Sequence, residues 1–258
     1  MSPVAIEKAR RARLALFGQR VDSRTKGLVG PLEQWLRRYA RLVLEQQLRR
    51  GVHKADDEEQ LRQEIERLLR IFGLRQLTDA ANSAERGSAV LIPPAAITDF
   101  LAMKQIHITG IMGETRAGVE RLIRETLIAG QREEPEPTAA EIARRLRAAL
   151  AANQDQERPF VVSPERAALI ARTELVQAVN TGIVEGYRAT GVAELEWLAY
   201  SDGNSGDRHH ERMNGQVVRL GEYFITPLGN RLRYPGDPTA PIKETANCRC
   251  TVAPRRAA

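Results

Sequence analysis

The spacing of apolar residues changes near residue 193, and this change limits the folds that the chain can adopt. Before it, apolar residues recur every three or four positions, which is the period of an amphipathic helix. After it, short runs such as ELEWLAYS alternate, with Leu195 and Trp197 on one face, as a strand would. The sequence therefore predicts an α+β fold, with a mostly helical N-terminal region and a small C-terminal α+β domain that contains an antiparallel sheet.

Prolines and glycines divide the helical region into separate predicted helices. Pro31 suits the first turn of a helix, and Gly73 is a natural stop. Gly110 and Gly113 could bend the longest helix. The predicted helices cover residues 31–50, 56–72, 76–90 and 97–129, and a shorter helix follows the capping box TAAE.

The second half of the chain begins with a helix and continues with short strands. Ser163 can cap this helix, Pro164 suits its first position, and Gly191 suits the position after its end. Short strands are predicted in QVVRL, EYFIT and CRCTVAP, and Gly229-Asn230 predicts a hairpin turn. We therefore divide the chain into a basic, partner-docking helical region (1–95), a long helix with a linker helix (96–160) and an α+β domain (161–258).

The basic charge is concentrated at the N-terminus. The whole chain has a net charge of +6, and residues 1–50 hold 12 Lys or Arg against 4 Asp or Glu. This excess predicts an acidic partner, either nucleic acid or an acidic protein surface. A nearby apolar stripe is the predicted docking surface and consists of Trp35, Leu36, Tyr39 and Val43. No run of eighteen apolar residues and no signal peptide is found, so we expect a cytosolic protein without a membrane span.

Several short motifs occur together in a recognisable order: IARTEL, AVNTGIVEGYRATG, EWLAYSD, HERMNGQVV, YFITPLGNRLRYPGDP and NCRCTVAP. In this order they resemble the phage head morphogenesis domain, the Mu F-like minor head protein family. The resemblance covers residues 98–254 and is most specific over 164–254. The residues that carry it are Arg172, Glu174, Asn180, Trp197, Asp202, His210, Gly215, Cys248 and Cys250.

The resemblance implies a minor capsid protein of the virion that acts in head morphogenesis. Such a protein lies inside the head near the portal in a few copies, is made in the host cytoplasm, and can leave with the DNA during ejection. Its implied partners are the portal protein, capsid or scaffold proteins, and packaged DNA. Because the phosphate-binding and nucleophile motifs of common enzyme classes are missing, we expect no enzymatic activity.

The chain has two cysteines, Cys248 and Cys250, separated by one residue. In a strand, residues i and i+2 point to the same face, so the two sulfurs would form half of a tetrahedral zinc site. His210 and His209 could complete it, and Asp202 and Asp207 are further candidates. No other cofactor is expected. The alternatives are buried thiols that pack as hydrophobic groups, with His210 bonding a loop, and a redox pair.

Arg172 is expected to point toward the sheet and to pair with a carboxylate such as Asp202 or with carbonyl groups. An alternative function also remains open at this point. The adjacent histidines and the later Asn-Cys pair resemble metal-dependent nucleases of the His-Asn-His type, which would use His210 and the cysteines to process DNA.

Overall fold

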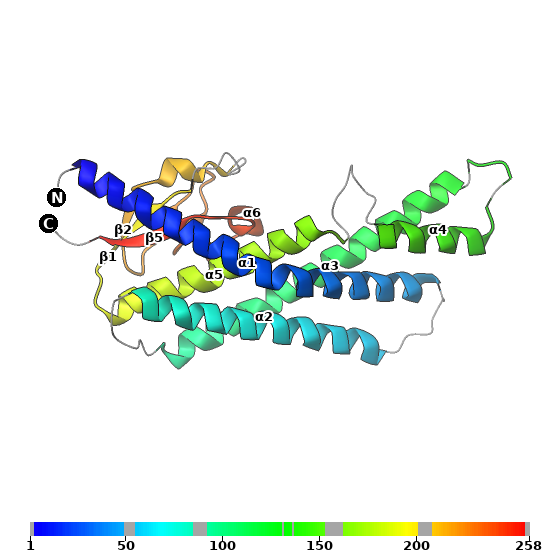
Figure 1. Cartoon of the computed structure of the whole chain (residues 1–258), viewed down its shortest axis with the longest axis horizontal. Coiled ribbons are helices and arrows are strands. Elements are labelled where there is room, and N and C mark those ends of the chain that lie inside the picture. The colour runs from blue at the N-terminus through cyan, green and yellow to red at the C-terminus, as the bar shows by residue number, and fades with distance from the viewer. Residues whose placement is uncertain are drawn as a thin grey trace. The chain divides into compact units, whose positions relative to one another are not determined.

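Long helices make up the first part of the described chain, and short strands lie in its last part (Figure 1). The computed structural model describes residues 3–48, 55–84, 92–130, 132–135, 137–152, 162–200 and 208–255. The helices are α1 (Pro3–Leu48), α2 (Ala55–Ala84), α3 (Pro94–Gly130), α4 (Ala139–Ala152), α5 (Pro164–Ala189), the 3-10 helix η2 (His210–Met213) and α6 (Ile242–Thr245). The strands are β1 (Glu194–Leu198), β2 (Val217–Arg219), β3 (Phe224–Ile225), β4 (Arg231–Leu232) and β5 (Thr251–Arg255). Among the described residues no strand precedes β1, and the predicted α+β class is confirmed.

The helix α1 runs through Pro31, so the prediction that a helix begins at this residue is wrong. A proline inside a helix removes a hydrogen bond to the carbonyl four residues earlier and costs about 3 kcal/mol. Here that carbonyl belongs to Gly27, and because both residues are exposed, water can bond it. Leu28 and Leu32 are both buried, which contributes about 3–6 kcal/mol and offsets the cost.

The helix α2 is also longer than predicted, because Gly73 does not end it. A glycine in a helix costs about 1 kcal/mol relative to alanine, which is less than the burial of one leucine contributes. Leu69 and Leu77, one turn before and after Gly73, are both buried. One apolar face therefore continues across the glycine, and residues 85–90 of the predicted third helix lie outside the described residues.

The helix predicted to start at residue 76 is part of α2, and α3 starts at Pro94, three residues before the predicted start, whereas the predicted starts of α4 and α5 and the end of α5 agree with the structure. The Thr138 side chain accepts a hydrogen bond from the N–H of Glu141 (3.3 Å), as expected of an N-cap. Ser163 does the same for the N–H of Arg166 (3.1 Å), one turn into α5. Gly191 follows α5 with φ +73°, a left-handed conformation that glycine adopts without strain. In the described part of the chain, no helix combines the length and the hydropathy that crossing a membrane requires.

The chain forms two compact units, each made of several separate stretches. Unit 1 consists of Met1–Gly27, Leu69–Met103 and Leu169–Ala258, and unit 2 consists of Leu28–Leu68 and Lys104–Ala168. The helices α1, α2, α3 and α5 therefore contribute to both units. The division into three consecutive regions follows the sequence motifs and stays a prediction.

The apolar stripe of α1 forms the core of unit 2, so the prediction that it docks on a partner is wrong. Its four residues are at most 1% exposed. The rings of Trp35 and Tyr39 stack with centroids 5.2 Å apart, and the Trp35 indole donates to the Leu61 carbonyl of α2 (2.6 Å). The Tyr39 hydroxyl donates to Glu58, which also pairs with Arg116 of α3 (2.6 Å). The chain's own helices thus cover the stripe.

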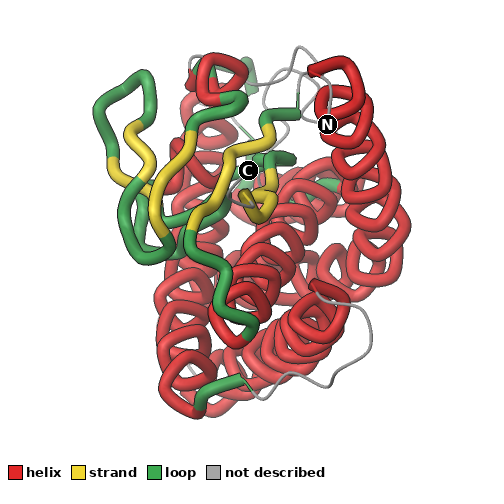
Figure 2. Tube along the Cα trace, turned by 90° about the vertical axis from the view of Figure 1, so that its left-hand side faces the viewer, coloured by secondary structure: helices red, strands yellow, loops and turns green. Residues whose placement is uncertain are grey.

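Unit 1 contains a three-stranded antiparallel sheet in the order β2-β1-β5. Trp197 in the central strand lies opposite Val252, and Leu195 lies opposite Val218 and Pro254. Figure 2 shows these strands in yellow beside the separate hairpin of β3 and β4. Leu195 and Trp197 join one core cluster with Val184 and Tyr187 of α5, as predicted, but burial does not alternate along β1, because Glu196 and Leu198 are buried as well.

Candidate metal centre

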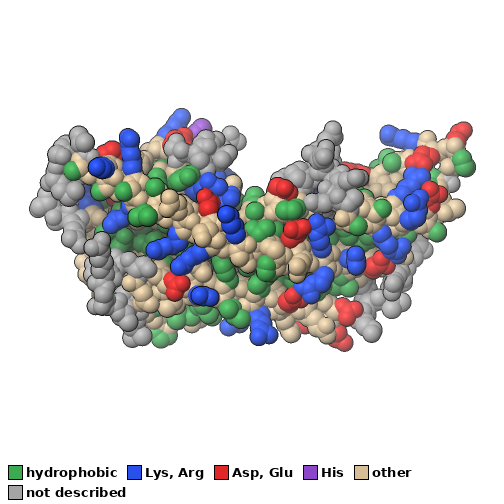
Figure 3. Space-filling view, viewed as in Figure 1, with side chains coloured by type: hydrophobic (Ala, Val, Ile, Leu, Met, Phe, Trp, Pro, Cys, Tyr) green, Lys and Arg blue, Asp and Glu red, His purple; other side chains and the backbone are tan. Residues whose placement is uncertain are grey.

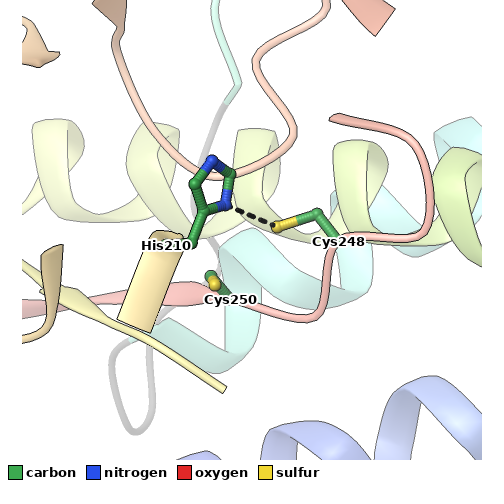
Figure 4. Close-up of side chains that lie close together, drawn as sticks. All are labelled: His210, Cys248 and Cys250. Carbon is green, nitrogen blue, oxygen red and sulfur yellow. Dashed lines mark hydrogen bonds between the residues drawn. The ribbon is translucent and has the colours of Figure 1, made fainter. Parts of the chain in front are cut away.

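Two thiols and one imidazole meet in the interior of unit 1 (Figure 4). His210 comes from η2, and Cys248 and Cys250 come from the segment between α6 and β5. Their candidate ligand atoms all lie within 4.8 Å of one another, and Nδ1 of His210 is 3.8 Å from Sγ of Cys248. All three residues are at most 3% exposed, and the cysteines are not bridged.

The two cysteines lie on a short segment between a turn and the strand β5. The strand β5 begins at Thr251, so the prediction that the cysteines themselves lie in this strand is wrong. The chain reverses at Asn247, whose φ is +56°, a left-handed conformation that asparagine tolerates better than most residues. The Cys248 N–H then bonds back to the Thr245 carbonyl (3.2 Å). Both thiols follow this turn and precede β5.

A buried carboxylate holds the imidazole in place. The Glu244 side chain is fully buried, and its Oε2 lies 2.8 Å from Nε2 of His210. Its Oε1 accepts hydrogen bonds from Thr226 (2.9 Å) and from Asn230 (2.6 Å) at the β3-β4 turn. Burial alone would raise the pKa of Glu244, but these bonds lower it below its ordinary value, so the group stays ionised.

The pKa values of the histidine and the thiols are shifted by their mutual contacts. Burial would lower the pKa of His210, but its contacts with Cys248 and Glu244 outweigh burial and raise it. A hydrogen bond from Cys250 lowers the pKa of Cys248 against the effect of burial, and His210 acts in the same direction. The bond to Cys248, together with burial, raises the pKa of Cys250. The site therefore favours one thiolate, that of Cys248.

Trp197 forms an aromatic wall of the site. Its ring meets the His210 ring edge-on with centroids 5.4 Å apart, and it meets Phe224 in the same way at 5.1 Å. The buried indole Nε1 makes no hydrogen bond of standard geometry among the described residues. The indole lowers the pKa of Cys250, but the contact with Cys248 and burial, which raise this pKa, have the larger effect. A donor is thus available for a sulfur that carries negative charge.

Residues of α5 anchor the turn before the cysteines. Arg172 was expected to bond a carboxylate or carbonyl groups, and its guanidinium donates to the side-chain oxygen of Asn247. The Asn247 N–H donates to the Thr173 hydroxyl (2.9 Å). Asp202, the suggested carboxylate partner, lies outside the described residues, as does Asp207. The Arg-Thr pair of the IARTEL motif thus positions the cysteine turn.

Asn180, the polar residue two turns further along α5, joins this helix to the end of the chain. Its side-chain amide donates to the carbonyls of Pro235 (2.9 Å) and Cys250 (3.0 Å), and its oxygen accepts from the Thr251 hydroxyl (2.7 Å). The side chain is fully buried. Asn180 therefore satisfies backbone groups that helix and sheet leave unpaired.

The remaining predicted residues lie around the cluster and not in it. His209 is 45% exposed in its side chain, and Nδ1 pairs with Glu211 (3.2 Å), so the structure does not bring it to the sulfurs. Gly215 has φ +82°, and its N–H donates to the Trp197 carbonyl (2.8 Å), which closes the turn after η2. Glu174 is buried on α5.

Sequence reasoning missed Glu244 and Asn247. The Glu244 contact spans 34 residues and the Arg172 contact spans 75, and no local spacing indicates either. The one available signal was an acidic residue just before the cysteine pair, in KETANC.

The geometry suits metal binding better than nuclease chemistry. A His-Asn-His nuclease places its histidine in a hairpin that leads into a helix, but after His210 the described residues form β2, the hairpin of β3 and β4, and the four-residue α6. Both ring nitrogens of His210 already contact Glu244 and Cys248. Soft thiolates with an imidazole are typical ligands of zinc.

The same residues fall within a stretch that matches a known family. The family model described as "Phage Mu protein F like protein" matches residues 117–253, which is more than half of the chain. Comparison with the curated proteins and with the solved structures finds no match. The match contains Arg172, Asn180, Trp197, His210 and the cysteine pair, on which the resemblance was based. The chain belongs to the family of proteins like phage Mu protein F and is a phage head-related protein.

Proposed function

We propose that this chain is a minor head protein that lies inside the phage head next to the portal, acts in head morphogenesis, and leaves with the DNA. The family match over residues 117–253 carries the proposal. The matched segment holds the C-terminal part of α3, all of α4 and α5, and most of the sheet, so the similarity extends well beyond the short motifs.

The positions of the motif residues support a structural role over a catalytic one. Arg172 and Asn180 bond the segments that carry the cysteines, and Gly215 closes a turn. His210, Cys248 and Cys250 are buried. These residues stabilise a particular fold, as expected of a protein whose task is to assemble with others.

The first part of α1 supports an acidic partner. Lys8, Arg13, Arg20 and Lys26 are exposed and have no acidic partner among the described residues. On the face drawn in Figure 3, basic side chains are interspersed with hydrophobic and acidic ones and do not form one continuous patch. These charges suit an acidic surface, and the proposal takes the portal as the main contact and packaged DNA as a secondary one.

Mass spectrometry of purified particles tests the proposal. The experiment compares four samples from the phage or prophage that encodes the chain. These are DNA-filled heads, empty proheads, heads after ejection and the isolated portal complex. We expect the protein in filled heads at far lower copy number than the major capsid protein, enriched with the portal complex and depleted after ejection. Its absence from all particles would contradict a head function. Its presence in filled heads, but away from the portal, would contradict the portal-proximal location.

A further inference from the structure

We propose that His210, Cys248 and Cys250 bind one zinc ion through Nδ1 and the two Sγ atoms, and that Glu244 orients the histidine from behind. This inference goes beyond the proposed head function and does not depend on it. It rests on the donor set, on the distances between the donors, and on the hydrogen bond at the far side of the imidazole.

The distances match a tetrahedral zinc ion. With Zn–S bonds of about 2.3 Å and Zn–N bonds of about 2.0–2.1 Å, neighbouring ligand atoms are about 3.5–3.8 Å apart. Nδ1 of His210 is 3.8 Å from Sγ of Cys248, and no two of the three donor atoms are more than 4.8 Å apart. Binding therefore requires a contraction of about 1 Å or less, which side-chain rotation can supply.

Glu244 selects the nitrogen that faces the sulfurs. In a neutral imidazole one nitrogen carries the proton and the other offers a lone pair. Because Nε2 lies 2.8 Å from the buried Glu244 carboxylate, which only accepts hydrogen bonds, Nε2 keeps a proton, and Nδ1, 3.8 Å from Sγ of Cys248, is the nitrogen that can bind zinc once its own proton is released. A carboxylate behind a ligating histidine is the usual support of a protein zinc site.

Thr226 and Asn230 fix this carboxylate in turn. The site therefore connects the hairpin of β3 and β4, the helix η2 and the segment before β5, three stretches that are not paired in one sheet. Among the described residues no fourth ligand joins these three, so the fourth position of the tetrahedron is open to water or to a group outside them. Zinc would thus stabilise a region that contains few regular hydrogen-bonded elements.

Metal analysis of the full-length chain, reduced and purified without chelator, tests the site. We expect about one zinc ion per chain by elemental analysis. Titration of the metal-free chain with Co²⁺ should give the visible bands of a tetrahedral ion and the near-ultraviolet sulfur-to-cobalt charge-transfer band that thiolate ligands produce. A chain that contains no zinc and yields neither band overturns the proposal, and this readout does not require any variant to fold.

Matched variants identify the ligands. His210→Ala, Cys248→Ala and Cys250→Ala should each lose the metal and the charge-transfer band or weaken it, whereas His209→Ala should keep both, because His209 pairs with Glu211 outside the cluster. Equal metal binding by all variants would show an adventitious ion only.

The positioning role of Glu244 has a separate test. Glu244→Gln should keep the two thiolate contacts but bind zinc about 10–100-fold more weakly in competition with a chelator. It should also leave the charge-transfer band in place at saturating Co²⁺. An unchanged zinc affinity would exclude the role assigned to Glu244, and loss of the band at saturation would make Glu244 a ligand instead.

Discussion

Single buried polar side chains hold the irregular C-terminal segments of unit 1 in place. Asp237 is fully buried and accepts bonds from the Arg233 guanidinium (2.9 and 3.0 Å), from the Arg233 N–H (2.8 Å) and from the Thr239 N–H (3.0 Å). Since β4 has only two residues, its exit has no ladder bonds to fix it. The hydrogen bonds to the Asp237 carboxylate therefore hold the chain after β4, as the ladder bonds of a longer strand would.

The stability of the chain should therefore fall in acid through Asp237. Burial would raise the pKa of this carboxyl, but its bonds to Arg233 and Thr239 lower it below the ordinary 3.8. A lowered folded-state pKa gives stability that is present above pH 3.8 and is lost as the pH falls through the folded-state value. Urea denaturation between about pH 7 and about pH 2.5 should show this loss for the wild-type chain.

Two Asp→Asn variants distinguish the contribution of Asp237 to the acid-dependent loss of stability from that of the other carboxylates. Asp237→Asn should lower the urea midpoint at neutral pH and should reduce the acid-dependent loss, because the titrating group is gone. Asp99→Asn, at an exposed position of α3, should change neither. An acid-dependent loss of the same size in the wild type and in Asp237→Asn would assign the effect to other groups.

For single residues, the sequence predicts only contacts between near neighbours in the chain and contacts among residues of one motif. Ser163 could be named as a cap because a cap bonds a residue three positions away. His210 and the cysteines could be grouped through their residue types. Glu244 could not be placed, because its partners come from separate turns that only the folded chain brings together.

Among the helices, the crossing of α2 and α5 in unit 1 depends on one glycine. A Cβ atom at Gly182 would overlap the carbonyl oxygen of Leu77 and would lie 3.0 Å from the Ala80 side chain. Both obstacles belong to the α2 helix, and backbone cannot rotate away as a flexible side chain would. The two helices approach closely only because residue 182 lacks a side chain.

Gly182→Ala should therefore destabilise the protein by about 1–3 kcal/mol, as overpacking does, although alanine is the better helix former. Gly110→Ala is the matched control, because a Cβ there meets nothing within 4 Å. That change should stabilise the helix α3 by about 0.5–1 kcal/mol. The two urea midpoints should shift in opposite directions, and a stabilising Gly182→Ala would rule out the close crossing.

Apolar periodicity predicts which elements form but not where all of them end. The helical region, the hairpin and the strands that contain Val217 and Trp197 follow from period and turn residues. The predicted helix start at Pro31 and helix end at Gly73 are wrong, because the burial of flanking leucines outweighs the local cost of either residue. The cysteines lie outside β5 because the left-handed turn at Asn247 delays the strand.

For the molecule as a whole, α1 supplies core residues to both units. Phe17 and Val21 pack in a cluster with α5 residues of unit 1, and Trp35 and Tyr39 lie in the core of unit 2. Each such side chain contributes about 1.5–3 kcal/mol, and a domain is typically stable by only about 5–15 kcal/mol. A chain without residues 1–50 should therefore lose cooperative unfolding by circular dichroism. A sharp, wild-type-like transition would show that α1 is dispensable.

Charge reversal tests partners of the basic segment without removing the core. Arg13→Glu with Arg20→Glu should keep the fold but weaken binding of the full-length chain to duplex DNA. The slope of log K against log salt should become shallower by about 0.9 for each phosphate that the variant no longer neutralises. Arg75→Glu, an exposed change on α2, is the control. Binding that is insensitive to both salt and the double variant would exclude a DNA contact through this segment.

Because the two thiols are buried, chemical modification of either one shows that a molecule has unfolded. Cys248 and Cys250 are the only cysteines in 258 residues, and each is 3% exposed. A thiol reagent can therefore modify a molecule only after the interior of unit 1 has opened. If the protein leaves the head through a channel too narrow for its folded form, alkylation during ejection would mark the molecules that unfolded on the way, and mass spectrometry would count them against unlabelled molecules that stayed folded.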